Sequence, residues 1–173
     1  LTPEALILFA RQQANVYDTQ IGNMLREMKE VSQHTAVLRG VQDFLNTWSS
    51  GHTTATDILD SQDPHVMINV TDENGQQVPM QLGEALDFLG IPRSFSRLPD
   101  GAAPGQYLQV HGNDLGPYRE RLRSAGEKLN EGSEMRSMNL QNAVSQRNQL
   151  FQMMAQMMMS MHETTKTITV YSP

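Results

Sequence analysis

The chain has 173 residues, of which 38% are apolar and 18% charged, a composition that fits one domain or one long scaffold with a small insert. Its 13 Lys and Arg against 19 Asp and Glu give a net charge of −6, which argues against nucleic-acid binding, because that function needs a concentrated basic surface. The absence of cysteine excludes disulfides, thiolate nucleophiles and Cys-type zinc sites, and no run of 18 apolar residues predicts a membrane span.

Residues 1–49 are expected to form a coiled-coil helix that starts at Pro3. Thr2 suits the N-cap, and proline suits the first turn. Apolar residues then recur in steps of three and four, which is typical of a helix that packs along a partner helix. They are Ile7, Ala10, Ala14, Tyr17, Ile21, Met24, Met28, Val31, Thr35, Leu38, Val41, Leu45 and Trp48, with one hitch near Gly40. The helix would be about 70 Å long and needs such a partner.

Residues 50–116 have a different character and predict a small mixed α/β insert. Ser49 to Thr54 has the composition of a linker. The elements that we expect are strands at 65–70, 77–80 and 107–110, a turn at 72–75, a helix at 82–89 ended by Gly90, and a Pro- and Gly-rich loop at 99–105.

Residues 117–173 are expected to form a helical region that pairs with the N-terminal helix. Asn113 or Asp114 can cap it, and the stretch 130–133 can interrupt it, with Ser133 as a possible new cap. The apolar face of its first part is Tyr118, Leu122, Ala125 and Leu129. The seam expected in its second part is Leu140, Val144, Arg147, Phe151, Met154, Met158, Met161, Thr165 and Ile168, with a second stripe at Leu150, Met153 and Met157.

The predicted fold is therefore mainly α: a long antiparallel N-/C-terminal coiled-coil hairpin with a small α+β insert. The two stripes of the last helix expose more apolar surface than one partner helix can cover. Six of the twelve methionines fall within residues 153–161. They fit core packing or an adaptable surface that contacts several neighbours, whereas thioether copper binding and membrane insertion have less support.

Residues that could carry catalysis or bind a metal do not form a recognisable pattern. The five histidines lack metal-site spacing, and no phosphate-binding loop or nucleophile elbow is present. Asp57, Asp60 and Asp63 are evenly spaced, but their loop lacks the glycine and the final glutamate of a calcium site, so we interpret them as solvated linker carboxylates. We expect no enzyme activity and no cofactor.

Two stretches carry a resemblance to a known family. The segments 115–130, 133–141 and Ser145 to Phe151 (Ser-Gln-Arg-Asn-Gln-Leu-Phe) resemble the C-terminal helical region of type III secretion filament and needle-tip proteins. Residues 66–91, a strand, a turn at Gly75 and the segment Leu-Gly-Glu-Ala-Leu-Asp-Phe-Leu-Gly-Ile, are similar to the insert that precedes it in that family. The loop 94–105 and the Met-rich tail depart from the family pattern. The length favours the EspA-like filament branch over the longer tip proteins.

The resemblance implies a self-assembling extracellular filament subunit, secreted as part of a bacterial surface appendage, that extends the secretion needle and conducts unfolded effector proteins. Open helical polymers arise from heterologous contacts that do not close. The implied partners are further copies of the chain, the needle, pore-forming translocators, the transported effectors and a cytoplasmic export chaperone that masks residues 135–170. A disordered export signal would precede Leu1, where no cleavable leader is visible. The alternatives are a needle-tip complex protein that supports translocon assembly and an intracellular helical scaffold or adaptor.

Two sets of residues follow from this interpretation. Those expected in helix packing and self-assembly are Ile7, Tyr17, Ile21, Met24, Met28, Val31, Leu38, Leu140, Val144, Leu150, Phe151, Met154, Met157, Met158 and Met161. Among them, Phe151, Met154, Met158 and Met161 are expected to bind neighbouring subunits. Those expected on or near a lumen are Gln141, Ser145, Gln149, Gln152, Gln156 and Ser160.

Overall fold

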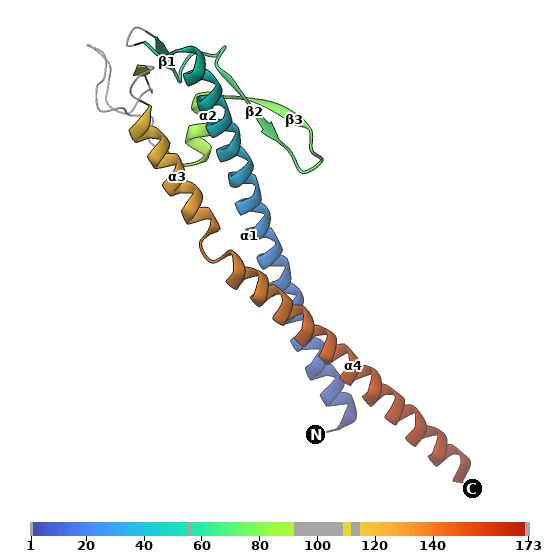
Figure 1. The fold of residues 1–173 in the computed structure, drawn as a ribbon. Coiled ribbons are helices and arrows are strands. Elements are labelled where there is room, and N and C mark those ends of the chain that lie inside the picture. The colour runs from blue at the N-terminus through green and yellow to red at the C-terminus, as the bar shows by residue number, and fades with distance from the viewer. Residues whose placement is uncertain (1, 55–56, 92–108, 112–114, 172–173) are drawn as a thin grey trace. The chain divides into compact units, whose positions relative to one another are not determined.

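The computed structural model describes residues 2–54, 57–91, 109–111 and 115–171 (Figure 1). Contacts group the chain into two compact units. Leu1–Lys29 and Gly132–Pro173 form one, which we call the hairpin unit, and Glu30–Glu131 forms the other, the core unit. The protein is mainly α, with long N- and C-terminal helices and a small antiparallel insert, as predicted. The boundaries predicted at 49 and 116 divide the chain by element type, whereas contacts divide the N-terminal helix between the units.

Helix α1 spans Pro3–Gly51 and confirms the predicted N-terminal helix. The Thr2 hydroxyl accepts the Ala5 amide at 3.1 Å, so it caps the helix as expected. At the other end, the Ser49, Ser50 and His52 side chains donate to the carbonyls of Asn46, Thr47 and Trp48 in the last turns of the helix. The His52 ring also stacks on Trp48 at 4.5 Å. All positions of the predicted apolar ladder are buried or half-buried.

The core unit contains two antiparallel strand pairs. Strand β2 (Met67–Thr71) pairs with β3 (Gln77–Gln81), as predicted within a residue or two. Strand β4 (Gln109–His111) pairs with β1 (Ile58–Asp60), with Leu59 opposite Val110. The sequence did not predict β1, because a three-residue strand has no measurable alternation and its partner lies far along the chain.

The β2–β3 hairpin turns where the sequence predicted. The Asp72 carboxylate accepts the amides of Asn74 and Gln76 at 2.9 and 2.8 Å, and Gly75 has a φ of 78°, which favours glycine. Pro79 is paired with Asn69 in β2. It is tolerated because the backbone N–H that proline lacks would point away from β2, so no hydrogen bond of the strand pair is lost. Helix α1 covers the outer edge of β2, since a Cβ on Gly40 would lie 2.6 Å from the Asn69 carbonyl oxygen. The hitch predicted near Gly40 is thus the place where β2 crosses α1.

One apolar core holds the core unit together. Its fully buried members come from α1, the β2–β3 hairpin, helix α2 (Leu82–Phe88) and helix α3 (Gly116–Asn130). The largest are Val41, Leu45, Ile68, Leu82, Leu86, Tyr118 and Leu122. Helices α1 and α3 approach closely, since a Cβ on Gly126 would lie 3.2 Å from Leu38. The predicted face of α3 is confirmed: Tyr118 and Leu122 are buried, and Ala125 and Leu129 pack against the same core.

Gln81 joins three parts of the core unit. Its Oε1 accepts the Glu84 amide at 2.9 Å and so caps α2, while its Nε2 donates to the carbonyls of Ser61 and Asp63. The helix ends at Phe88, and Gly90 follows with a φ of 66°. Both the helix and its glycine stop were predicted, but the link to the Ser61–Asp63 turn was not.

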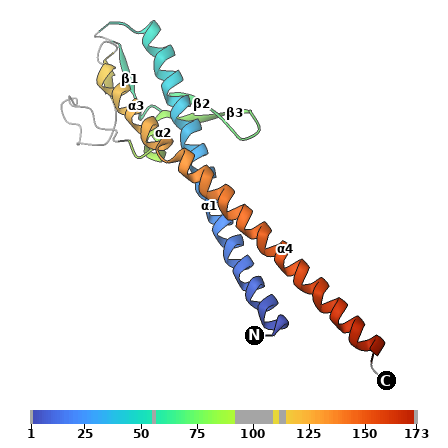
Figure 2. The same cartoon turned by 60° about the horizontal axis from the view of Figure 1, so that its bottom comes forward.

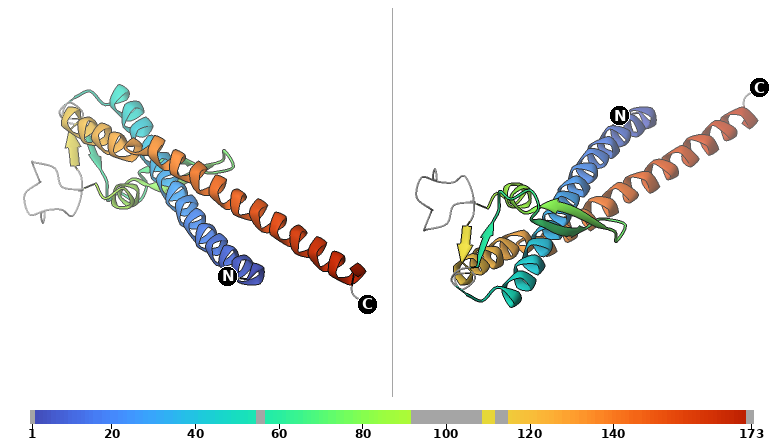
Figure 3. Two further views of the ribbon diagram at one scale, coloured as in Figure 1. Left: turned by 90° about the horizontal axis from the view of Figure 1, so that it is seen from below. Right: turned by 90° about the horizontal axis from the view of Figure 1, so that it is seen from above.

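The C-terminal helical region is interrupted where expected. Helix α3 ends at Asn130, Gly132 has a φ of 75°, and helix α4 then runs from Ser133 to Tyr171. In the hairpin unit, the start of α1 and the end of α4 lie at the same end, so the two helices are antiparallel (Figures 2 and 3). The 99–105 loop, residues 107–108 of the third predicted strand and the proposed caps at 113 and 114 lie outside the described residues.

Candidate assembly surface

The seam of the hairpin unit is a regular repeat on both helices. On α1 the less exposed apolar positions are Ile7, Ala10, Ala14, Tyr17, Ile21, Met24 and Met28. On α4 the less exposed positions are the apolar Leu140, Ala143, Leu150, Met154, Met157 and Met161, with Arg147 among them. Both sets alternate steps of three and four, which is the pattern of an antiparallel two-helix coiled coil. In the core unit, Val31 is half-buried and Leu38 is buried.

The predicted seam of α4 was partly wrong. Val144, Phe151 and Met158 are exposed, and the seam uses Ala143, Leu150 and Met157 instead. Small Ala143 was overlooked in favour of its larger neighbour. Thr165 and Ile168 are also exposed, contrary to prediction. In an antiparallel pair whose register passes through Asp18 and Arg147, Pro3 at the start of α1 lies opposite His162, so Thr165 and Ile168 lie beyond the first turn of α1.

Arg147 is the one charged residue in the α4 seam, and the structure explains it. Its Nε donates to the Asp18 carboxylate of α1, and its guanidinium lies 4.6 Å from the centre of the Phe151 ring. The ion pair neutralises the charge, while the ring takes a cation–π contact from the exposed side of the seam. Asp18 was not singled out from the sequence, since one acidic residue among many on a long helix gives no signal.

Exposed apolar side chains lie on both sides of this seam. Leu8 and Met158 line one hollow between α1 and α4, together with Arg11. Leu6 and Met153 line a second hollow. Helical geometry places Met153 and Met158 on opposite sides of the buried Met154 and the half-buried Met157. The hairpin unit therefore has two separate apolar faces beyond the seam.

We define these faces by their exposed residues. The first face consists of Leu8 on α1 with Val144, Phe151 and Met158 on α4. The second face consists of Leu6 on α1 with Met153 on α4. Phe9 and Val16 of α1 are exposed as well. Phe9 is 59% exposed and Phe151 42%. Aromatic and methionine side chains at this exposure, grouped on one unit, are typical of an interaction surface. The sequence predicted excess apolar surface on α4 but missed the contribution of α1.

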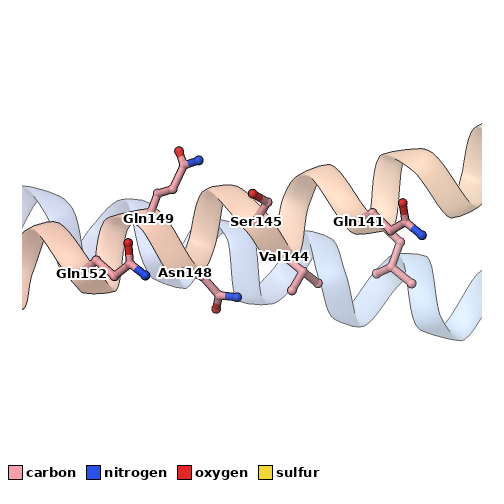
Figure 4. Close-up of a pocket in the computed structure, with 7 residues that line it drawn as sticks. Gln141, Val144, Ser145, Asn148, Gln149 and Gln152 are labelled. Atoms are coloured by element: carbon pink, nitrogen blue, oxygen red, sulfur yellow. The ribbon is translucent and has the colours of Figure 1, made fainter.

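The predicted lumen residues form a polar face on α4. Gln141, Ser145, Gln149, Gln152, Gln156 and Ser160 are all exposed. Most of them, with Val144 and Asn148, line a shallow hollow along the helix (Figure 4). Between 141 and 156 the only charged residue is Arg147, which lies in the seam. This side of α4 thus presents amide and hydroxyl groups without a charge, and it lies next to the first face.

The core unit carries a groove and several local turn contacts. The groove is lined by α1 and the β2–β3 hairpin, including Ala36, Val70 and Val78, and by Phe88, on which His34 stacks at 4.4 Å. Asp57, Asp60 and Asp63 each accept hydrogen bonds from nearby amides, so they stabilise turns rather than acting only as solvated carboxylates. No three His, Cys, Asp or Glu side chains gather in a metal-binding arrangement within the described ranges.

Among the described residues, the pKa values that are shifted belong to groups in exposed local contacts. The Thr54 hydroxyl and amide lower the pKa of Asp57. Arg123 lowers the pKa of Glu120, while Glu120, with Glu127, raises the pKa of Arg123. Each shift comes from partners within five residues along the chain, which is typical of helix and turn stabilisation rather than of a catalytic cleft.

Comparisons with known proteins leave the family resemblance a prediction. No protein-family model matches the chain, no curated protein matches it, and no solved structure matches its fold. None of the helices in the described part of the chain combines the length and apolar character of a membrane span. The exposed surface of the hairpin unit is therefore the feature of the molecule that bears on function.

Proposed function

We propose that this chain is a self-assembling subunit of an extracellular filament that extends a type III secretion needle and conducts unfolded effector proteins. One observation carries the proposal: α4 has an exposed apolar flank and, next to it, an uncharged amide face. The wall of a protein conduit needs both, because each subunit must bind its neighbours and must not hold the passing chain. Phe151 and Met158 would bind neighbouring subunits, and Gln149 and Gln152 would face the lumen.

The chemistry of the amide face suits transport of many different sequences. A charged lumen would retain segments of the opposite sign, and an apolar lumen would retain exposed hydrophobic segments. Glutamine, asparagine and serine exchange hydrogen bonds with water at little net cost, so a moving chain gains little by stopping. The proposed partners are further copies of the chain, the needle, the pore-forming translocators, the effectors and an export chaperone.

Met154 plays a different part from the one first expected. It is only 6% exposed, so it stabilises the hairpin within one chain rather than binding a neighbouring subunit. A Met154→Asp substitution would therefore damage the subunit itself and cannot serve as a clean test of assembly. Phe151→Asp with Met158→Asp is the appropriate variant, because both side chains are exposed.

The test is made in the bacterium that encodes the chain, with the secretion apparatus intact or disabled. We expect surface filaments that label with an antibody to this chain only when the apparatus is intact, and none with the Phe151→Asp, Met158→Asp variant. Small caps at needle ends would favour the tip-complex alternative. A chain that stays inside the cell in both strains would favour the scaffold alternative and overturn the proposal.

The lumen assignment has its own test. Changing Gln149 and Gln152 to Asp is expected to leave filaments of normal length but to reduce effector delivery. If delivery is unchanged in that variant, these residues do not line the conduit, although the filament proposal stands.

A further inference from the structure

The methionine-rich stretch of α4 carries an exposed histidine that belongs neither to the seam nor to the two apolar faces. His162 follows Met158 by four residues and Met159 by three, within the unbroken helix α4. All three side chains are exposed, Met158 to 54% and Met159 to 65%. Residues three and four apart lie on the same side of a helix, so the two thioethers and the imidazole share one surface.

The direction of helical side chains brings these three groups together. Side chains of an α-helix lean toward its N-terminus, so the ring of His162 extends over the turn that carries Met158 and Met159. The spacings of three and four residues put the Cβ atoms about 5–6 Å from that of the histidine. Each methionine has three rotatable bonds, which let its sulfur reach a position beside the imidazole. Side-chain rotation alone can therefore place two sulfur atoms and one nitrogen atom around a single ion.

His162 also differs from the histidines of α1 and its C-terminal end. Nδ1 of His34 and Nδ1 of His52 each lie 2.8 Å from the carbonyl oxygen four residues earlier, and both rings stack on an aromatic side chain. Within the described part of the chain, His162 has no hydrogen bond, ion pair or ring contact. Neutral imidazole has one nitrogen that can accept a ligand bond, and in His162 this nitrogen is open to solvent.

We propose that Met158, Met159 and His162 bind a soft monovalent cation, copper(I). Thioethers are soft ligands that select copper(I), and imidazole also suits copper, whereas Ca²⁺ and Mg²⁺ require oxygen ligands. Zinc in proteins is held by imidazole, thiolate or carboxylate, and two of the three donors here are thioethers. The donor set therefore favours copper(I) over these divalent ions. The spacing of the histidine to methionine, rather than to another histidine, defines the site.

The charges around the three donors neither attract nor repel a cation strongly. Glu163 lies next to the histidine, and Lys166 lies one turn beyond it. Beside Met158, one acidic and one basic residue, Glu4 and Arg11, line the hollow between α1 and α4. These two carboxylates and two cations balance. The ion is therefore held by its bonds to sulfur and nitrogen, which again favours a soft metal.

A second exposed methionine pair on α4 provides a matched control. Met135 and Met138 are 63% and 59% exposed and are three residues apart. No histidine lies within four residues of either methionine. If exposed thioethers alone were sufficient, this pair would contribute to metal binding as much as Met158 and Met159 do.

The test uses the full chain at a concentration too low for assembly, so its outcome does not depend on the proposed function. The site variants are His162→Gln and Met158→Leu with Met159→Leu, and the control variant is Met135→Leu with Met138→Leu. Leucine keeps the apolar volume of methionine but removes the sulfur, and circular dichroism checks that the helices are retained. Calorimetric titration with Ag⁺ in chloride-free buffer measures binding of a soft ion without redox chemistry. Anaerobic competition with bicinchoninate measures binding of copper(I) itself.

Wild type and the control variant are expected to bind one ion with the same Kd. Each site variant should bind it at least about tenfold more weakly, because losing even a residue that only supports a metal ligand costs about 10–100-fold in affinity. In nuclear magnetic resonance spectra, the His162 ring and the methyl groups of Met158 and Met159 should shift together as the first equivalent of metal is added.

Three results would overturn the inference. Absence of binding by wild type would exclude the site. Equal affinity of wild type and His162→Gln would mean that the histidine is not a ligand. An equal loss of affinity in the Met135→Leu, Met138→Leu control would mean that the methionines of α4 bind the metal without a defined site. None of these results bears on filament assembly.

Discussion

Replacement of Gly40 by alanine tests the junction between α1 and β2. The new Cβ would lie 2.6 Å from the Asn69 carbonyl oxygen and 3.4 Å from Ile68 Cδ1. The obstacle is a backbone carbonyl in a paired strand, which cannot rotate away as a side chain can. Either β2 must move from α1 or the helix must bend.

The expected size of the effect follows from two opposing terms. Alanine in a helix interior is favoured over glycine by about 1 kcal/mol. Overpacking a tight site costs about 1–3 kcal/mol, and a backbone obstacle favours the upper part of that range. Gly40→Ala should therefore destabilise the core unit by about 1–2 kcal/mol. Gly22→Ala is the matched control on the same helix: its Cβ meets nothing within 4 Å, so it should stabilise by about 0.5–1 kcal/mol.

Urea unfolding at a concentration too low for assembly measures both variants. Trp48 is the only tryptophan and packs against the core, so its fluorescence reports on the core unit, while far-ultraviolet circular dichroism reports on the helices. The Trp48 midpoint should fall in Gly40→Ala and should not fall in Gly22→Ala. If Gly40→Ala raises the midpoint as much as the control does, then β2 does not cross α1 as described.

Three further substitutions address the hairpin unit and the helix surface. In thermal unfolding, Met154→Ala should destabilise the protein by about 2–3 kcal/mol and Met158→Ala by under about 0.5 kcal/mol, because only Met154 is buried. Equal effects of the two substitutions would mean that the seam does not pass through Met154 in preference to Met158. Asp18→Asn should cost less than about 1 kcal/mol, and 1 M salt should remove the difference from wild type. An effect of the same size in 1 M salt would mean that the Asp18–Arg147 contact does not stabilise the hairpin unit through its charges. Because Arg123 lowers the pKa of Glu120, the ionised carboxylate stabilises the fold above its ordinary pKa near 4.5, and this stabilisation is lost as the pH falls through the folded-state pKa. The free energy of unfolding of wild type should therefore exceed that of Glu120→Gln at neutral pH but not in acid. A constant difference between the two from pH 7 to pH 2 would contradict the pairing.

Elements governed by local signals could be predicted from the sequence. The Thr2 cap, the ladder of α1, the turn at Gly75 and the break at Gly132 each depend on residues a few positions apart. The β1–β4 pairing could not be predicted, since its strands are three residues long and about fifty residues apart. The same holds for the contacts of Gln81, which depend on a turn some twenty residues earlier.

The candidate surface was predicted in kind but not in position. A count of large apolar residues on α4 selects Val144 over Ala143, although a small residue suits a close approach of two helices. The true seam was visible only as a second stripe. Because the seam passes through Ala143, Leu150 and Met157, Val144 and Phe151 lie beside the seam, where they are exposed. Excess apolar surface was therefore a sound prediction, and its location required the register between α1 and α4.

The central claim is that the hairpin unit keeps enough apolar surface exposed to recruit further copies of the chain. Electron microscopy of the purified full chain, concentrated in near-physiological salt, measures this most directly. The account predicts open fibres of variable length for wild type and dispersed particles for Phe151→Asp with Met158→Asp. Wild-type protein that remains as single dispersed particles at the highest attainable concentration would contradict it.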